Sequence, residues 1–499
     1  MHIADFERDA DAMLTATTRA RYLEASGAWP ALPLPQIHER WPELSSLDTY
    51  EQLLDVEAEE RVATGVQHLA LELHLGGIAA HHDAQLANTE RQLTVEWGGD
   101  AIPWRLARQV VNVEEERSLR HDLDTAIREA SGPLVTGRLS RLKFQRRRLE
   151  RLGQYDLPTD DLGFWSLVRG VAVDEVSKLA AWLLEETSEL YLDALRDQLV
   201  HHRLDEGDTW AVDLEWLFRG QEYDRVFPDH LLMPSITRAF WDLGIRLEDQ
   251  ANLRLDLDDH QERVTRSFCA PIGVPDEIVA MLAPRGGVAD YVGLLQTVGE
   301  AERHAYADRT QSIVYRRLGD RAVTEGYGLL FAGLLERPEW LTLRLEADAT
   351  RDAIRLRAFE RLYRLRRAAV THLYEVELRT HEFDPRGDEQ PDALSEEYVD
   401  RLADALYVRP FREDYLNVND DPFASAHHLR AALFGCQLGQ FLTQEMDEEW
   451  FRSLRAGRFL VDRWREGQRY TAEELARFLG HSGLDPSLLV TELRTGLVG

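Results

Sequence analysis

Residues 290–325 read DYVGLLQTVGEAERHAYADRTQSIVYRRLGDRAVTE, and the interpretation of the whole chain rests on them. They follow a turn of the type Pro-Arg-Gly-Gly at residues 284–287, and we predict that they begin with a helix. The centre of that helix consists of Gln296, Thr297, Val298, Gly299 and Glu300. Its first and last members are four residues apart, so their side chains share one helix face. A further carboxylate, Glu325, follows 25 residues after Glu300.

The composition is that of a soluble globular protein of 499 residues, with 44% hydrophobic residues. A balance of 58 basic against 89 acidic residues gives a net charge of −31, which repels nucleic acid and anionic membranes. We therefore expect neither as a partner. Two cysteines, Cys269 and Cys436, are too few for a disulfide framework or a cysteine zinc site. No segment resembles a signal peptide or a membrane span, so we predict a cytoplasmic protein.

Three regions follow one another along the chain. Residues 1–48 are irregular and rich in proline, which predicts an N-terminal arm. Residues 49–250 show apolar positions at steps of three and four, so we predict an N-terminal helical region. In residues 251–499 the pattern predicts a small sheet over 251–284 and helices over 290–499. The predicted fold class is mainly α.

This order of elements resembles the zinc oligopeptidases of the thimet oligopeptidase and oligoendopeptidase F family. Three further stretches resemble parts of that family: RSFCAPIGVP at 266–275, GDRAVTEG at 319–326 and DPFASAHHLRA at 421–431. The similarity extends over residues 253–479 and is only general before them. It implies a two-walled helical cleft with a small β-sheet beside the metal-site helix. It also implies that residues 251–499 correspond to the catalytic region of the metallopeptidases.

The family's chemistry requires the motif His-Glu-x-x-His, in which two imidazoles and a later carboxylate hold zinc and the first Glu is the general base. In the corresponding positions this chain has Gln296, Thr297 and Glu300, and Glu325 keeps the place of the third ligand. The wall opposite the zinc carries tyrosines in the family, where they stabilise the oxyanion. Here those positions correspond to Ala424 and His428.

These replacements predict a degenerate metallopeptidase, or pseudoenzyme, which lacks hydrolysis but retains a groove for a peptide or protein. We accordingly expect no metal cofactor. A second ligand set, Glu300, His304 and Glu325, keeps an alternative open, because Glu300 and His304 share a helix face. With zinc or another divalent ion on that set, the chain would be an active metallo-oligopeptidase or another hydrolase. Against this set, the charged run of residues 302–304 predicts a solvated His304.

A binding groove in this family uses a sheet edge, and an extended peptide can pair with such an edge through main-chain hydrogen bonds. A short apolar run bounded by prolines is the candidate strand in this chain. We predict that the peptide-pairing strand consists of Ile278, Val279, Ala280, Met281 and Leu282.

Overall fold

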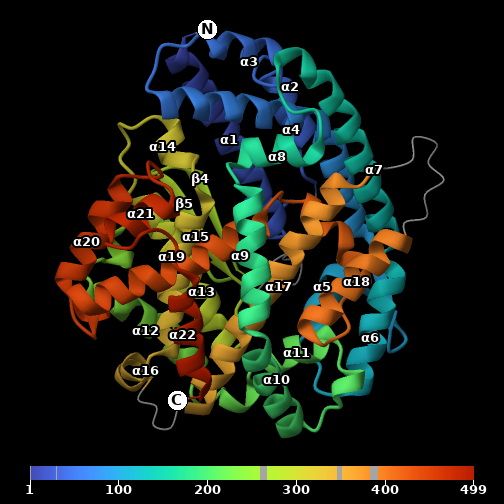
Figure 1. The fold of residues 1–499 in the computed structure, drawn as a ribbon, viewed down its shortest axis with the longest axis vertical. Helices are drawn as coiled ribbons and strands as arrows, with labels where there is room; N and C mark the ends of the chain where they lie inside the picture. The colour runs from blue at the N-terminus through green and yellow to red at the C-terminus, as the bar shows by residue number, and fades with distance from the viewer. Residues whose placement is uncertain (1, 30, 259–266, 346–350, 383–391, 499) are drawn as a thin grey trace.

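The computed structural model describes residues 2–29, 31–258, 267–345, 351–382 and 392–498. The chain is mainly helical and carries two small β-sheets, which confirms the predicted fold class (Figure 1). None of the helices in the described ranges is both long and apolar enough to cross a lipid bilayer.

In the described part of the chain, twelve α-helices precede the three-stranded sheet. They are α1 (Ile3–Ala25), α2 (Leu34–Arg40), α3 (Leu47–Leu54), α4 (Glu60–Gln92), α5 (Trp104–Val110), α6 (Arg117–Ala130), α7 (Gly132–Leu149), α8 (Asp161–Arg169), α9 (Val173–Glu186), α10 (Ser188–His202), α11 (Ala211–Phe218) and α12 (Asp229–Asp242). A hairpin of β1 (Thr94–Trp97) and β2 (Asp100–Pro103) interrupts the predicted helical region. Its turn is formed by Gly98 and Gly99, whose φ angles of 65° and 91° suit glycine.

The three-stranded sheet consists of β3 (Leu253–Asp256), β4 (Ser267–Gly273) and β5 (Glu277–Leu282). Their order is β3-β5-β4, with β5 parallel to β3 and antiparallel to β4. Residues 278–282 therefore lie in the central strand, where both neighbours already use their main-chain groups. The prediction that Ile278, Val279, Ala280, Met281 and Leu282 form a peptide-pairing edge is wrong for this reason, and β3 and β4 are the edge strands instead.

Both faces of this sheet are covered by helices. Ile278, Ala280 and Leu282 pack with the apolar side chains of α13 (Val288–Ala305). Val279 and Met281 point to the other face, where they pack against Tyr22 and Ala25 of α1. Tyr22 also donates a hydrogen bond of 2.6 Å to Asp256 at the end of β3.

Helix α1 corrects the prediction of an irregular arm over residues 1–48. The prolines that suggested the arm, Pro30, Pro33 and Pro35, all follow α1 in the sequence. Within the helix, Phe6, Ala10 and Met13 are fully buried at steps of four and three residues. The apolar face of α1 therefore needs the sheet and its neighbouring helices to cover it.

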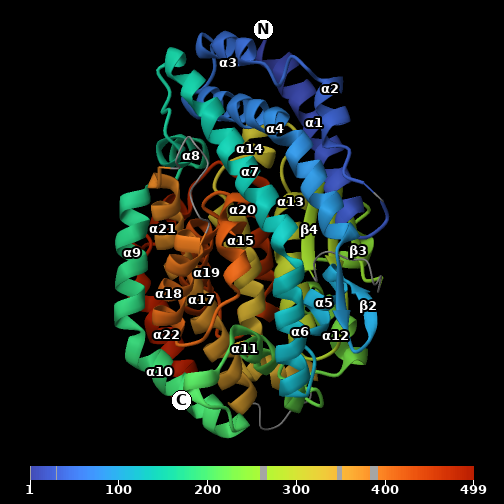
Figure 2. The ribbon, with the colours of Figure 1, turned by 90° about the vertical axis from the view of Figure 1, so that its right-hand side faces the viewer.

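The remaining helices after α13 are α14 (Ile313–Arg317), α15 (Arg321–Ala332), α16 (Pro338–Leu345), α17 (Arg351–Thr380), α18 (Asp392–Leu406), α19 (Ala424–Glu445), α20 (Leu454–Arg465), α21 (Ala472–Phe478) and α22 (Pro486–Val498). Helix α9 packs along α17, and Figure 2 shows this pair beside α18 and α22. The largest hydrophobic core joins Leu183 and Leu195 with Tyr363, Leu429 and Leu493. The two halves of the chain thus share a core, and their division near residue 250 stays a prediction.

Candidate functional site

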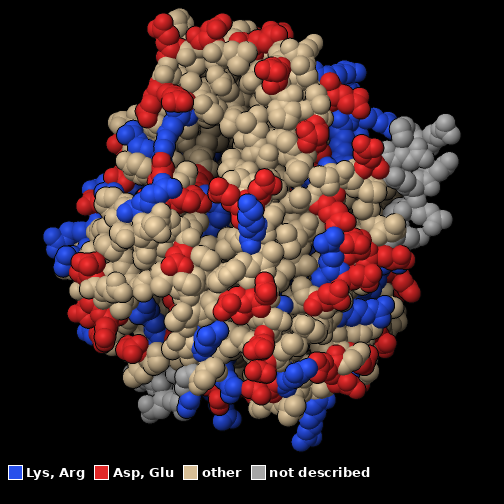
Figure 3. Space-filling model, viewed as in Figure 1, with Lys and Arg blue, Asp and Glu red and all other residues tan. Residues whose placement is uncertain are grey.

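A cavity of about 1650 Å³ lies among the helices that follow the sheet. Its walls come from β4 and α13, from α15, from the arginine-rich α17, and from α19 and α22. Among the described residues, its lining begins at Cys269 and ends at Gly496, so the first twelve helices contribute none of it. The outer surface is hollowed below the N-terminal helices (Figure 3).

Two glycines bring α13 and α15 into close contact beside this cavity. A Cβ atom on Gly299 would lie 3.0 Å from the carbonyl oxygen of Tyr327 and 3.1 Å from the Cα of Gly328. A Cβ atom on Gly328 would lie 2.9 Å from the carbonyl oxygen of Gln296. The two backbones can approach this closely only because neither position carries a side chain. The close contact holds the polar residues of α13 against those of α15.

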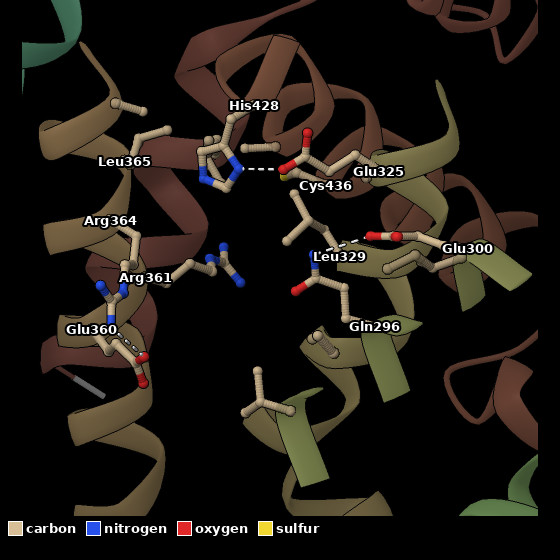
Figure 4. A pocket seen from close by; sticks show the side chains of 18 of the residues that line it. Gln296, Glu300, Glu325, Leu329, Glu360, Arg361, Arg364, Leu365, His428 and Cys436 are labelled. Carbon is tan, nitrogen blue, oxygen red and sulfur yellow. Dashed lines mark hydrogen bonds and ion pairs between the residues drawn. The ribbon is translucent and has the colours of Figure 1, made fainter. Parts of the chain in front are cut away.

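The polar residues at the centre of α13 interact with their own helix. Gln296 donates its side-chain amide to Glu300, with 3.1 Å between Nε2 and Oε1, and both residues line the cavity (Figure 4). Thr297 is buried, with 4% of its surface exposed, and its hydroxyl donates to the carbonyl oxygen of Gly293 over 2.6 Å. The Thr297 side chain therefore binds to the backbone of its own helix and does not line the cavity.

Glu325 and His428 form an ion pair between α15 and α19, with 2.5 Å between Oε1 and Nδ1 (Figure 4). Burial alone would raise the pKa of the Glu325 carboxyl, but the neighbouring imidazole outweighs it and the pKa is lowered. Burial alone would lower the pKa of His428, and the Glu325 carboxylate raises it instead. Ala424 lies one turn before His428 on the same cavity wall and offers no hydrogen-bond donor from its side chain.

Glu300 differs from Glu325 in its protonation. Burial and, to a lesser extent, the negative charge of Glu325 together raise the pKa of Glu300 to about 8, against the opposing effect of Gln296. At neutral pH Glu300 is therefore mainly protonated, whereas Glu325 is ionised. Cys269 of β4 also lines the cavity, and burial together with Glu300 raises the pKa of its thiol well above the ordinary value. A thiol in that state is a poor nucleophile.

The second predicted ligand set is not assembled. Across the described ranges, the only three His, Cys, Asp or Glu residues whose ligand atoms lie within 4.8 Å of one another are on α10 and a short helix near it, not at this cavity. Glu300, His304 and Glu325 are therefore too dispersed to hold one ion as they stand. The prediction that His304 is solvated is also wrong, because His304 is buried and its Nδ1 lies 2.9 Å from a guanidinium nitrogen of Arg303.

Arginines of α17 form the cavity wall that the sequence interpretation missed. Arg357, Arg361 and Arg364 recur at steps of four and three residues, so they share one helix face, and this spacing is the signal that could have revealed them. Figure 4 shows Arg361 and Arg364 on α17 across the cavity from Glu300 and Gln296. Each arginine already has acidic partners. Arg361 contacts Glu336 and Glu492, and Arg364 contacts Glu215 and Glu360.

Zinc, the ion that the resemblance implies, does not fit the residues present. Zinc sites in proteins are built from neutral imidazoles, thiolates and ionised carboxylates. The cavity offers instead the amide of Gln296, a mainly protonated Glu300, and a Glu325 whose oxygen is occupied by His428. One free anionic oxygen on Glu325 is too few donors for a stable zinc centre.

Comparisons with known proteins support the resemblance at the level of the fold. No family profile matches the chain, and no curated protein sequence does. A Bacillus anthracis strain Ames protein assigned as an oligoendopeptidase F is 12% identical, with a TM-score of 0.60 over 90% of this chain and 78% of that one. Another protein assigned as an oligoendopeptidase F is 12% identical, with a TM-score of 0.63 over 95% of this chain and 84% of that one.

A third similar structure is PZ peptidase A, solved with an inhibitor. It is 11% identical, with a TM-score of 0.60 over 96% of this chain and 86% of that one. Identities this low show a shared fold and carry no statement about activity. The chain therefore has the fold of the oligoendopeptidase F-like peptidases.

Proposed function

We propose that this chain is a catalytically inactive relative of the zinc oligopeptidases that binds a peptide or an extended protein segment in its cavity. One observation carries the proposal. The side chains at the motif positions are satisfied by protein partners, Gln296 by Glu300 and Thr297 by Gly293, while a cavity of about 1650 Å³ is kept beside them. A cavity of this size exceeds the usual range for a drug-sized ligand, ~300–1,000 Å³, and suits a longer chain.

Strand β4 is the element that we assign to the bound peptide. It is an edge strand, and its Cys269 and Pro271 line the cavity. Arg317 already binds the carbonyl oxygens of Pro271 and Ile272, over 3.1 and 2.7 Å. A peptide would therefore pair with the part of β4 that precedes Pro271, and its side chains would alternate between the two faces of the sheet.

The experiment compares binding and cleavage of the same fluorogenic peptide library. We expect the wild-type protein to bind members of the library without cleaving them, with zinc, with manganese or after treatment with a chelator. The triple variant Q296H/T297E/E300H restores the family motif and should gain zinc binding and measurable cleavage. The triple variant Q296A/T297A/E300A is its control and should gain neither. Cleavage by the wild type that a chelator abolishes would refute the proposal.

A second candidate function is hydrolysis without a metal. Glu300 and Glu325 belong to one cavity, and their environments push their pKa values in opposite directions, which is the arrangement of a general acid and a general base. Metal-free protein would be assayed on peptide, ester and glycoside substrates at pH 5 to 9. Activity that disappears in both E300Q and E325Q would favour this function, and inactivity across the panel would remove it.

A further inference from the structure

Two histidines and a glutamate meet on the surface, away from the cavity. His201 and His202 are the last two residues of α10, and Glu222 belongs to the short helix η3 (Gln221–Tyr223). His201 Nε2 lies 3.1 Å from Glu222 Oε2, and His202 Nε2 lies 3.9 Å from Glu222 Oε1. Within the described part of the chain, no other three His, Cys, Asp or Glu residues bring their ligand atoms within 4.8 Å of one another.

The geometry allows two adjacent histidines to share one ion. Neighbouring residues of a helix diverge by about 100°, so their side chains rarely converge by themselves. Here the third residue comes from another segment, and each of its two carboxylate oxygens faces one of the imidazoles. Bonds of ~2.0–2.1 Å to a tetrahedral zinc place neighbouring ligand atoms ~3.3 Å apart. The observed separations of 3.1 and 3.9 Å lie on either side of that value.

The nitrogen His202 Nε2 is an independent sign of a missing ligand. This atom is buried and has no hydrogen-bond partner, because Glu222 at 3.9 Å is too distant to provide one. The ring is fixed by Trp216, whose ring centroid lies 5.4 Å away at an interplanar angle of 80°.

The local electrostatics also suit a cation. Both histidines lie in the last turn of α10, where the carbonyl groups of the helix end carry partial negative charge. Glu222 supplies a full negative charge beside them. Two imidazoles and one carboxylate form a ligand set that zinc accepts, with a water molecule in the fourth position.

We propose that His201, His202 and Glu222 bind a divalent transition metal, zinc in the first place, and that the ion ties the end of α10 to η3. None of the three residues lines the cavity, so this site is independent of the proposed peptide binding. The ion would satisfy His202 Nε2 and strengthen the junction between α10 and η3.

The test uses full-length protein without a histidine tag, stripped of metal with a chelator. Cobalt(II) is titrated while its visible absorption is recorded, and zinc is then added in competition. We expect one equivalent of cobalt with the intense absorption of a tetrahedral site, and its displacement by zinc. The variants H201Q and E222Q should bind at least ~10-fold more weakly. The side chains of His201 and Glu222 are 58% and 38% exposed, so neither substitution disturbs the core.

Two control variants locate the ion. His81 also precedes a histidine in the sequence but is an exposed residue of α4, and H81Q should bind cobalt as the wild type does. E325Q removes a carboxylate from the cavity and should likewise leave the titration unchanged. The proposal is overturned if the wild type shows no tetrahedral cobalt spectrum, if H201Q and E222Q titrate like the wild type, or if E325Q abolishes binding.

Discussion

His428 Nδ1 lies 2.5 Å from Glu325 Oε1, so an ion pair occupies the place where the resembling peptidases are expected to hold the third zinc ligand. Both side chains are only about one quarter exposed, at 28% and 27%, which shields the pair from solvent. Helices α15 and α19 are thereby joined through the cavity wall. The carboxylate that the resemblance assigns to metal binding is thus paired with an imidazole of α19.

A double-mutant cycle with Glu325→Gln and His428→Gln measures this pair. We expect a coupling energy of about 1–2 kcal/mol at pH 6, from denaturant unfolding of the four proteins. The lowered pKa of Glu325 means that its contribution is lost as pH falls through that pKa, and the raised pKa of His428 means that its contribution is lost as pH rises through that pKa. The coupling should therefore shrink at pH 3 and at pH 9. A coupling that is constant over this range would contradict the ion pair.

Glu300→Gln tests the protonated state of the buried carboxyl. The pKa of Glu300 is raised to about 8 from an ordinary value of 4.5, so folding favours its protonated form. Its contribution to stability is complete below pH 4.5 and is lost as pH rises through 8. The variant, which cannot ionise, should gain about 4 kcal/mol of unfolding free energy relative to the wild type between pH 5 and pH 9, at ~1.4 kcal/mol for each pH unit between the two pKa values. Equal pH profiles for the two proteins would show that Glu300 is not buried in this way.

Local sequence patterns were sufficient to predict the helical fold class and the presence of the small sheet. They did not give the strand order, because that order depends on pairing between distant segments. A sign was nevertheless present in the sequence. The run from Ile278 to Leu282 is apolar at every position, and such a run is typical of a strand buried on both faces. An edge strand would alternate apolar and polar residues.

At the candidate site, too, local sequence patterns did not reveal the contacts between distant segments. Glu300 and Glu325, which the resemblance relates through their 25-residue separation, both line the cavity, because α13 and α15 pack against each other. The charged run at residues 302–304 indicated exposure, yet all three side chains are buried, since helices and strands surround the end of α13. Likewise, no spacing rule brings Glu222 to His201 and His202, because the contact arises only when η3 folds back against α10.

Gly299→Ala tests the close contact between α13 and α15. The added methyl group would lie 2.8 Å from the Phe331 ring and 3.0 Å from the Tyr327 carbonyl oxygen, so the helices must separate. We expect a loss of about 1–3 kcal/mol in unfolding free energy and weaker peptide binding. Gly132→Ala is the matched control, because a Cβ atom there meets nothing within 4 Å, and it should be neutral or slightly stabilising. Equal effects of the two substitutions would contradict the close contact.

Arg317→Lys tests whether α1 belongs to the structural core. The guanidinium of Arg317 binds Asp11 of α1 over 2.5 Å and the carbonyl oxygens of Pro271 and Ile272 in β4 over 3.1 and 2.7 Å. A lysine ammonium cannot reach all three partners at once, so the variant should lose about 2 kcal/mol in denaturant unfolding.

Arg309→Lys is the matched control for this change. Its ion pair with Asp276 lies at the surface, with side chains 73% and 58% exposed, so the substitution should alter stability by less than about 0.5 kcal/mol. Limited proteolysis gives a second readout, since Arg317→Lys should expose the segment of α1 to cleavage before the rest of the chain and Arg309→Lys should not. If Arg317→Lys leaves both readouts unchanged, the hydrogen bonds of Arg317 contribute nothing to the attachment of α1, and the apolar contacts of Phe6, Ala10 and Met13 hold this helix by themselves.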